Sequence, residues 1–346
     1  MRMIFNLNNA TKAASFILAM FLLNSCGSQQ TNHEEKKKTD SLEIKLNSPE
    51  LKEVNAQILN SPGDAALYNK RARVYLRLNQ LQEGVNDAKR AIRLDSTKAE
   101  YYLTLVDAHF MRNETRPAKD VLETAEKKFP RNTEALLKLA EIYYLVQNYQ
   151  KGIDYVNKAL KVDEHIAKAY YIKGSIYRES GDTAKAISSL ETAVEQDNRY
   201  EDAFYDLGVL YAARKNPIAF QYYDNVLRVN PSSSSAVYAR AKLLQDLGRT
   251  DEAIAAYEKI VAANPRCENC YYNLGAIWLE VKKDPKKALE YFTKAIEINP
   301  SYVEAYFARG YTYTKLKDKE SAKADYNMCL RIEPNYNPAV EGLNGL

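Results

Sequence analysis

The chain is poor in the side chains that enzymes most often use for catalysis. Its 346 residues include three histidines, four cysteines and one tryptophan. His33, His109 and His165 lie far apart in the sequence, and no GxSxG elbow, HExxH pair or glycine-rich phosphate loop is present. The carboxylates are dispersed, as a helix surface requires. We therefore expect a non-enzymatic protein that uses neither a cofactor nor a metal.

The cysteines include one close pair, Cys267 and Cys270, in the sequence CENC. A thiolate at a helix N-terminus has a lowered pKa, which permits a redox role, whereas an oxidising compartment permits a simple local disulfide. A zinc site would need further ligands, and none adjoins the pair in sequence. A structural role, a redox role and a metal site stay open, and the structural role is favoured because the βαβ setting of redox motifs is absent. Cys329 is expected to be a small buried residue.

Charge and apolar runs also exclude some classes of protein. The formal net charge of +4 gives no reason to expect nucleic acid. The uncharged apolar run at 13–23 is too short to span a bilayer as a helix, but it follows Arg2 and Lys12 as the hydrophobic region of a secretory signal does. The sequence LNSC at 23–26 resembles the lipobox of bacterial lipoproteins, in which the cysteine is lipidated and becomes the mature N-terminus.

This resemblance implies a signal peptide at 1–25 and a lipidated Cys26, with ordinary cleavage or a membrane anchor as alternatives. Residues 26–47 have few apolar side chains and mixed charge, which favours a disordered tether. No acidic residue follows Cys26 directly, so the resemblance to sorted lipoproteins favours the outer membrane of a Gram-negative cell. The face of the membrane, periplasmic or surface, stays open.

The rest of the chain is dominated by one repeated pattern. Eight copies follow one another at intervals of about 34 residues, beginning at Ala65, Ala99, Thr133, Ala167, Glu201, Ser234, Glu268 and Val303. Large apolar side chains recur at positions 4, 7 and 11, with a small residue usual at position 8, and a second set recurs at positions 20, 24 and 27. Spacings of three and four predict two helices per copy, separated by turns such as Gly181-Asp182 and Gly248-Arg249. A small residue at position 20 lets the two helices approach closely.

The pattern resembles the tetratricopeptide repeat (TPR) family, whose helix–turn–helix unit has 34 residues. The resemblance implies an all-α fold, a right-handed superhelical solenoid of eight repeats. Their expected boundaries are 65–98, 99–132, 133–166, 167–200, 201–233, 234–267, 268–302 and 303–336. Arrays of this kind present an extended surface, so the resemblance implies binding and leaves the partner open.

The ends and two irregular copies lead to further predictions. Residues 48–64 are expected to form an N-terminal capping helix, and 337–346 a short C-terminal cap in which Val340 and Leu343 continue the repeat register. The fifth copy is one residue short and the seventh one long, both at the turn between helices. Their second helices are expected to restart near Pro217 and Pro285, the latter after Asp284 as the N-cap.

Aromatic residues at position 5 form the first candidate binding feature. In the family this position borders the concave face, and five consecutive copies carry Tyr171, Tyr205, Tyr238, Tyr272 and Phe307. These rings are predicted to form a column along the groove, suited to a partner protein or, alternatively, to stacking on sugars. The other interpretation is that aromatic residues are simply common packing residues there.

An apolar strip in the second and third copies is the second candidate. It consists of Leu103, Phe110, Met111, Leu137, Tyr144 and Leu145. Asp107 and Glu141 stand beside it, which suits an amphipathic or extended peptide carrying some basic residues. Packing between repeats would explain the same residues equally well.

The sequence thus predicts a scaffold or adaptor anchored to the bacterial cell envelope that binds a partner protein or peptide in its groove. An envelope glycan-binding or polysaccharide-export accessory factor is the alternative. Partner identity and oligomeric state are not predicted. The carboxylate clamp known from some TPR proteins is excluded, because it needs lysine at position 5 and asparagine at position 9, and the first copies have neither.

Overall fold

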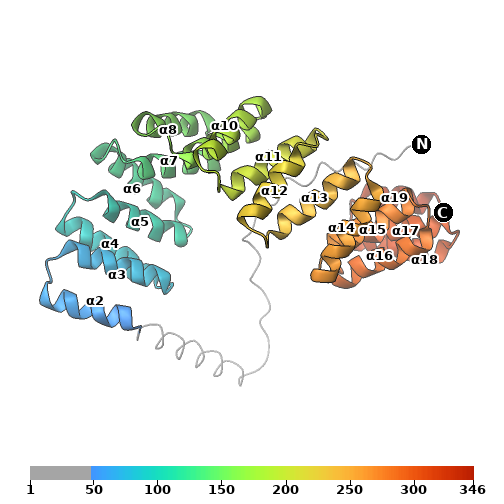
Figure 1. Cartoon of the computed structure of the whole chain (residues 1–346). Helices are drawn as coiled ribbons and strands as arrows, with labels where there is room; N and C mark the ends of the chain where they lie inside the picture. The colour runs from blue at the N-terminus through green and yellow to red at the C-terminus, as the bar shows by residue number, and fades with distance from the viewer. Residues whose placement is uncertain (1–47) are drawn as a thin grey trace, which may run out of the picture. The chain divides into compact units, whose positions relative to one another are not determined.

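The computed structural model describes residues 48–346, which form helices and no strand. The first helices of the eight repeats are α3 (Ala65–Arg77), α5 (Ala99–Met111), α7 (Thr133–Leu145), α9 (Ala167–Glu179), α11 (Glu201–Ala213), α13 (Ser234–Asp246), α15 (Glu268–Glu280) and α17 (Val303–Lys315). The second helices are α4 (Leu81–Leu94), α6 (Thr115–Lys128), α8 (Tyr149–Val162), α10 (Thr183–Gln196), α12 (Ala219–Val229), α14 (Thr250–Ala263), α16 (Pro285–Ile298) and α18 (Lys319–Ile332). The prediction of an all-α array of paired helices is confirmed. Figure 1 shows the helices in chain order.

The described helices belong to two compact units, the first ending at Glu114 and the second beginning at Thr115. The first unit holds α2 (Pro49–Asn60) and α3 to α5, and the second holds α6 to α18 and α19 (Asn337–Asn344). The boundary falls inside the second repeat, between α5 and α6. Within each unit, every helix packs against the next one along the chain.

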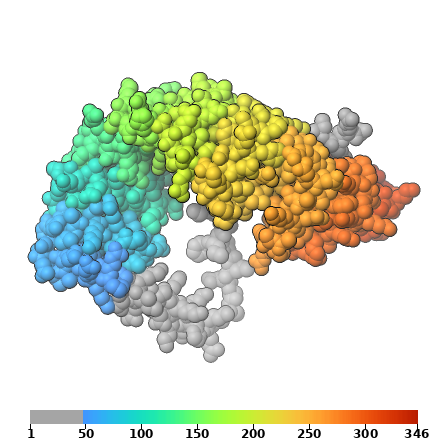
Figure 2. All heavy atoms as spheres, viewed as in Figure 1, coloured from blue at the N-terminus to red at the C-terminus, as the bar shows by residue number. Residues whose placement is uncertain are grey.

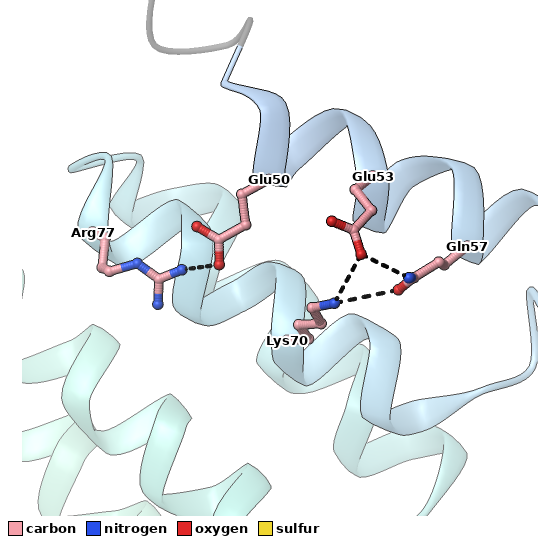
Figure 3. A network of polar contacts seen from close by, with 5 residues as sticks. All are labelled: Glu50, Glu53, Gln57, Lys70 and Arg77. Carbon is pink, nitrogen blue, oxygen red and sulfur yellow. Dashed lines mark hydrogen bonds and ion pairs between the residues drawn. The ribbon is translucent and has the colours of Figure 1, made fainter.

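In the first unit, α2 packs on α3 through Leu51, Val54 and Ile58, which are buried together with Tyr68. Ser48 caps α2 by accepting a hydrogen bond from the backbone N–H of Leu51. Polar contacts also join α2 to α3, as Figure 3 shows. The Arg77 guanidinium pairs with Glu50, and Lys70 contacts Glu53 at 3.7 Å and Gln57 at 3.4 Å. α2 therefore covers the apolar face that the first repeat would otherwise expose.

Small side chains allow the two helices of a repeat to approach closely. Position 20 is buried in every copy. At position 8, a Cβ on Gly208 would lie 2.4 Å from the Tyr223 ring, and one on Gly275 would lie 2.7 Å from the Phe292 ring. Any larger residue at these glycines would displace a buried ring. Figure 2 shows that side chains fill the space between the paired ribbons of the second unit.

The turns and the two irregular copies follow the sequence prediction. Gly181 and Gly248 have φ angles of 85° and 73°, a region that favours glycine. In the seventh copy Asp284 caps α16, accepting from the backbone N–H of Lys287 at 3.1 Å. In the fifth copy α12 begins at Ala219, two residues after Pro217, and has 11 residues where the other second helices have 14.

The C-terminal helix α19 differs in detail from the predicted cap. Leu343 packs against the cluster of α17 and α18, as its register position predicts. Val340, which the same repeat register also predicts to be a packing residue, is 40% exposed. Ala339 is instead the fully buried residue of this helix.

Candidate partner-binding face

Neighbouring first helices of the second unit contribute side chains to a common face. Its members stand at positions 2, 5, 6, 9, 12 and 13 of each first helix, and we call it the first-helix face. α7 contacts α9 directly. Lys168 of α9 pairs with Glu141 of α7 at 2.8 Å, and Arg178 of α9 pairs with Asp206 of α11 at 2.6 Å. These ion pairs between repeats link α7 to α9 and α9 to α11.

The position-5 rings pack against other rings of the chain. Tyr205, Tyr238, Tyr272 and Phe307 each contact an aromatic residue of their own second helix, with ring centroids 5.8 to 6.1 Å apart. Tyr171 contacts Tyr200, the residue that precedes α11, at 5.1 Å. Burial raises the pKa of Tyr171 and of Tyr272 to about 12. Packing is therefore a large part of what these rings do.

The five rings nevertheless differ in exposure. Phe307 is only 7% exposed and lies among Tyr311, Tyr326 and Tyr336. The four tyrosines keep intermediate exposure. A continuous column of partner-contacting rings would therefore exclude Phe307, whereas the tyrosines retain some accessible surface.

The predicted apolar strip is divided between the two units. In the first unit Leu103 is buried, while Phe110 and Asp107 are partly exposed and Met111 is 48% exposed. In the second unit Leu137 is buried, whereas Leu145 is 66% exposed. Leu103 and Leu137 are thus core residues. Met111 and Leu145, both at position 13, are the apolar members with the most accessible surface.

Tyr144 and Glu141 connect the strip to its polar neighbours in the second unit. The centroid of the Tyr144 ring lies 6.4 Å from that of Tyr149, and burial raises the pKa of Tyr144 while the nearby Arg178 opposes this rise. The carboxylate of Glu141 forms an ion pair with Lys168. The exposed Leu145 therefore lies beside a polar network formed by α7 and α9.

The centre of that network is an aspartate that the sequence motifs did not single out. Asp206, at position 6 of α11, is 9% exposed. Arg178 contacts its Oδ1, but among the described residues its Oδ2 is buried and has no hydrogen-bond partner. Burial raises the pKa of Asp206; Arg178 opposes this, and the charges of Asp202 and Glu179 add to it. We name Arg178, Glu179, Asp202 and Asp206, with Tyr171 and Tyr205, the α9–α11 site.

The sequence contained a signal for this site. Position 6 holds an acid in the fifth copy alone, and a basic, small or neutral residue in the others. Because acids are common on helix surfaces, an isolated departure of this kind did not stand out. The ion pair with Arg178, 28 residues earlier in the chain, becomes visible only when the repeats are stacked.

The cysteine pair forms a disulfide in the structure. Cys267 is the N-cap of α15, and Cys270, three residues on, is fully buried in the core between α13 and α15. Cys329 is a free, buried thiol, as predicted, and burial raises its pKa to about 12. Residues 48–346 contain no group of three or more histidine, cysteine, aspartate or glutamate side chains placed to hold a metal ion.

The N-terminal predictions concern residues outside the described range. The signal peptide at 1–25, lipidated Cys26 and the tether at 26–47 all precede Ser48. Within 48–346, no helix has both the length and the apolar character needed to cross a membrane. His109, by contrast, lies in the described range and is buried at position 11 of its repeat, with its Nδ1 2.7 Å from Glu114 Oε2.

Paired helices that share one face define a helical-repeat scaffold. Tetratricopeptide repeat models match residues 65–98, 103–169, 209–266, 238–302 and 303–336, and a TPR repeat model matches 174–214. The chain therefore belongs to the tetratricopeptide repeat family and is a protein–protein interaction scaffold of that class.

Curated proteins from Bos taurus and Dictyostelium discoideum are similar to this chain in sequence. BBSome complex member BBS4 of Bos taurus is 25% identical over 266 residues, which are 67% of this chain and 51% of that protein. A DnaJ homolog subfamily C member 7 homolog of Dictyostelium discoideum is 22% identical over 302 residues, 78% of this chain and 56% of that protein. The chain thus spans about half the length of the curated relatives it matches.

Solved structures show the same fold. A tetratricopeptide repeat protein from Parabacteroides merdae is 22% identical with a TM-score of 0.55, and the match covers 71% of this chain and 97% of that one. The C-terminal part of a TPR repeat-containing protein from Cytophaga hutchinsonii is 21% identical with a TM-score of 0.58, covering 71% and 99%. At these identities the likeness concerns the fold alone.

Proposed function

We propose that the protein is a non-enzymatic adaptor, anchored to the bacterial cell envelope, that holds a partner protein or peptide against its first-helix face. The anchor is supported by the sequence LNSC at 23–26 and by the apolar run before it. Several acyl chains on Cys26 would hold the chain durably on a membrane, since each buried methylene contributes about 0.8 kcal/mol. The tether at 26–47 would let the repeats stand off from the bilayer.

The observation that carries the binding proposal is the accessible part of the first-helix face on α7, α9 and α11. Leu145 is exposed there, and the partly exposed Tyr171 and Tyr205 stand beside the under-satisfied Asp206. Aromatic residues and exposed apolar side chains beside charged ones are typical of interaction surfaces. Phe307 of the last repeat is buried by its neighbouring rings, and glycan binding has no observation of its own in its favour.

Crosslinking with mass spectrometry in the native cell tests the adaptor proposal. We expect one defined protein to crosslink to side chains of the first-helix face, and few crosslinks to second-helix residues. Failure to recover a protein partner from envelope extracts would contradict the proposal.

A Cys26→Ser variant tests the anchor separately. We expect it to move from the membrane to the soluble fraction while its circular dichroism stays that of the wild type. Equal membrane retention of both proteins would contradict lipidation as the anchor.

A further inference from the structure

The α9–α11 site carries an excess of negative charge. Glu179 lies 3.4 Å from Arg178, and Asp206 lies 2.6 Å from it, so one guanidinium faces two carboxylates. Asp202 is exposed, and its charge acts on both Asp206 and Tyr171. Two acids thus contact one base, the charge of a third acts on Asp206, and Asp206 keeps an oxygen without a partner among the described residues. Leaving a buried acceptor unpaired is unfavourable, and a donor from a binding partner would remove this cost.

Aromatic rings border the same acids. Tyr171 of α9 and Tyr205 of α11 are both close enough to Asp206 for its charge to raise their pKa, in addition to the larger effect of burial. Both rings keep part of their surface accessible. Aromatic faces beside carboxylates attract cations, since the ring quadrupole and the negative charge act in the same direction.

The charge excess extends along the first-helix face of the second unit. The acids are Glu134, Glu141, Glu179, Asp202, Asp206, Asp246, Glu280 and Glu304, and the bases are Lys138, Lys168, Arg178, Lys242 and Lys315. Acids outnumber bases on this face, whereas the whole chain has a net charge of +4. The face is therefore complementary to a basic partner rather than to an acidic one.

We propose that the α9–α11 site binds a cationic side chain, lysine or arginine, of the partner held on the first-helix face. The inference rests on the proposed function and specifies its partner chemistry. The partner's cation replaces Arg178 at Asp206 and packs against Tyr171 and Tyr205. Arg178 keeps an ion-pair partner during this exchange, because Glu179 already contacts it at 3.4 Å. The covered oxygen of Asp206 becomes reachable as Arg178 moves aside.

Matched peptides test this recognition with the full chain. The probes are immobilised nonapeptides of one neutral sequence whose central residue is lysine, arginine, norleucine or glutamate. We expect the lysine and arginine peptides to bind about 10-fold more tightly than norleucine, roughly the effect of one charge-assisted hydrogen bond. Equal binding of lysine and norleucine peptides, preference for glutamate, or no binding of any peptide would each overturn the inference.

Two variants of the site sharpen the test. Asp206→Asn is expected to abolish the preference for lysine over norleucine, while Glu195→Gln, which changes an exposed acid of the second helix α10, leaves it unchanged. Arg178→Met is expected to strengthen lysine binding several-fold, because it removes the competing cation. A purely structural ion pair predicts no such gain, so unchanged or weaker binding by folded Arg178→Met would contradict the exchange.

Failure of this inference is distinguishable from failure of the proposed function. If the native partner crosslinks to the first-helix face but the peptides show no charge preference, the adaptor proposal stands and cation recognition is wrong. If no partner crosslinks to that face, the adaptor proposal itself fails.

Discussion

Two arginine–aspartate pairs of the second unit differ in how many of the two aspartate oxygens the arginine contacts. In the last repeat, Arg309 donates from Nε and Nη2 to both oxygens of Asp325, each at 2.8 Å, and also donates to Thr293. Between the fourth and fifth repeats, Arg178 reaches only one oxygen of Asp206 and leaves the other buried and unpaired. The first pair joins the two helices of one repeat, whereas the second lies between the first helices of two.

The first unit repeats the complete arrangement. Arg71 donates to both oxygens of Asp87, at 2.6 and 2.9 Å, between α3 and α4. The first and last repeats thus each contain a largely buried pair in which both aspartate oxygens are hydrogen-bonded, which we call a saturated pair. The arginine of each pair stands at position 7, where the second, third, fifth and seventh copies have leucine. Saturated pairs hold helices together, and a pair with an unused acceptor is free to take part in binding.

Breaking the saturated pair is expected to have the largest effect on stability. Asp325→Ala leaves the Arg309 guanidinium largely buried without its partner, which typically costs about 3–5 kcal/mol. Hydrogen exchange of the α17 and α18 amides measures the local opening free energy. The double variant Arg309→Met/Asp325→Leu is the control and should regain most of the loss. A loss under about 1 kcal/mol for Asp325→Ala would show that the pair is not structurally important.

A second buried polar residue at position 6 gives the next largest effect. Asn273 donates from Nδ2 to the hydroxyls of Tyr238 and Tyr257 at 2.9 and 3.1 Å, whereas Asp206 keeps one oxygen without a hydrogen-bond partner among the described residues. Asn273→Ala removes the donor to both hydroxyls and is expected to lower stability by about 1–3 kcal/mol. Thermal melting followed by circular dichroism measures this. Peptide binding at the α9–α11 site should be unchanged, and a parallel loss of binding would contradict the separation of the two sites.

The disulfide between Cys267 and Cys270 is expected to contribute less. It closes a very short loop, for which chain entropy gives about 2 kcal/mol at most. Cys267→Ala/Cys270→Ala should therefore lower the melting temperature modestly and leave partner binding unaltered under both oxidising and reducing conditions. If binding by the wild type instead changed reversibly with dithiol treatment, and the variant lost that response, a redox role would replace the structural one.

Charged substitutions of Tyr144 and Leu145 are expected to affect binding more than stability. Leu145 is 66% exposed, so Leu145→Lys should change the free energy of unfolding by less than about 0.5 kcal/mol. The added positive charge would repel a basic partner, and affinity for the lysine nonapeptide should fall several-fold. Leu137→Lys, a buried neighbour in α7, is the matched control that should unfold the repeat. Equal losses of melting temperature and binding in Leu145→Lys would mark that side chain as core.

The smallest expected effect is the pH dependence that comes from Asp206. Burial raises the pKa of its carboxyl in the folded state above the unfolded value of about 3.9, so the folded chain binds this proton more tightly. Asp206 therefore lowers stability as the pH rises from the unfolded pKa through the folded one. Asp206→Asn removes this contribution. The wild-type minus variant difference in melting temperature should become more negative with rising pH, and a difference that becomes more positive would contradict the raised pKa.

The fold was predictable because its determinants are local and repeated. Eight copies of one spacing predict the helix pairs, Asp284 next to Pro285 predicts the start of α16, and small residues at position 20 predict close packing. The candidate site was less predictable. Phe307 and Leu137 stand at position 5, where other copies carry partly exposed tyrosines. Whether a residue is buried at this position depends on which ring or helix the neighbouring segment of the chain places against it. The pairing of Arg178 with Asp206 depends on the stacking of two repeats, which no local pattern encodes.

Site-specific photocrosslinking at Leu145 tests the central claim most directly. A photoreactive residue there, in cells that express the full chain, should give one partner adduct, and the same residue at the exposed Lys161 of α8 should give none. The adduct at Leu145 should disappear when Asp206→Asn is combined with it. Adducts that form at Lys161 and not at Leu145 would place the partner on the second helices and contradict the account.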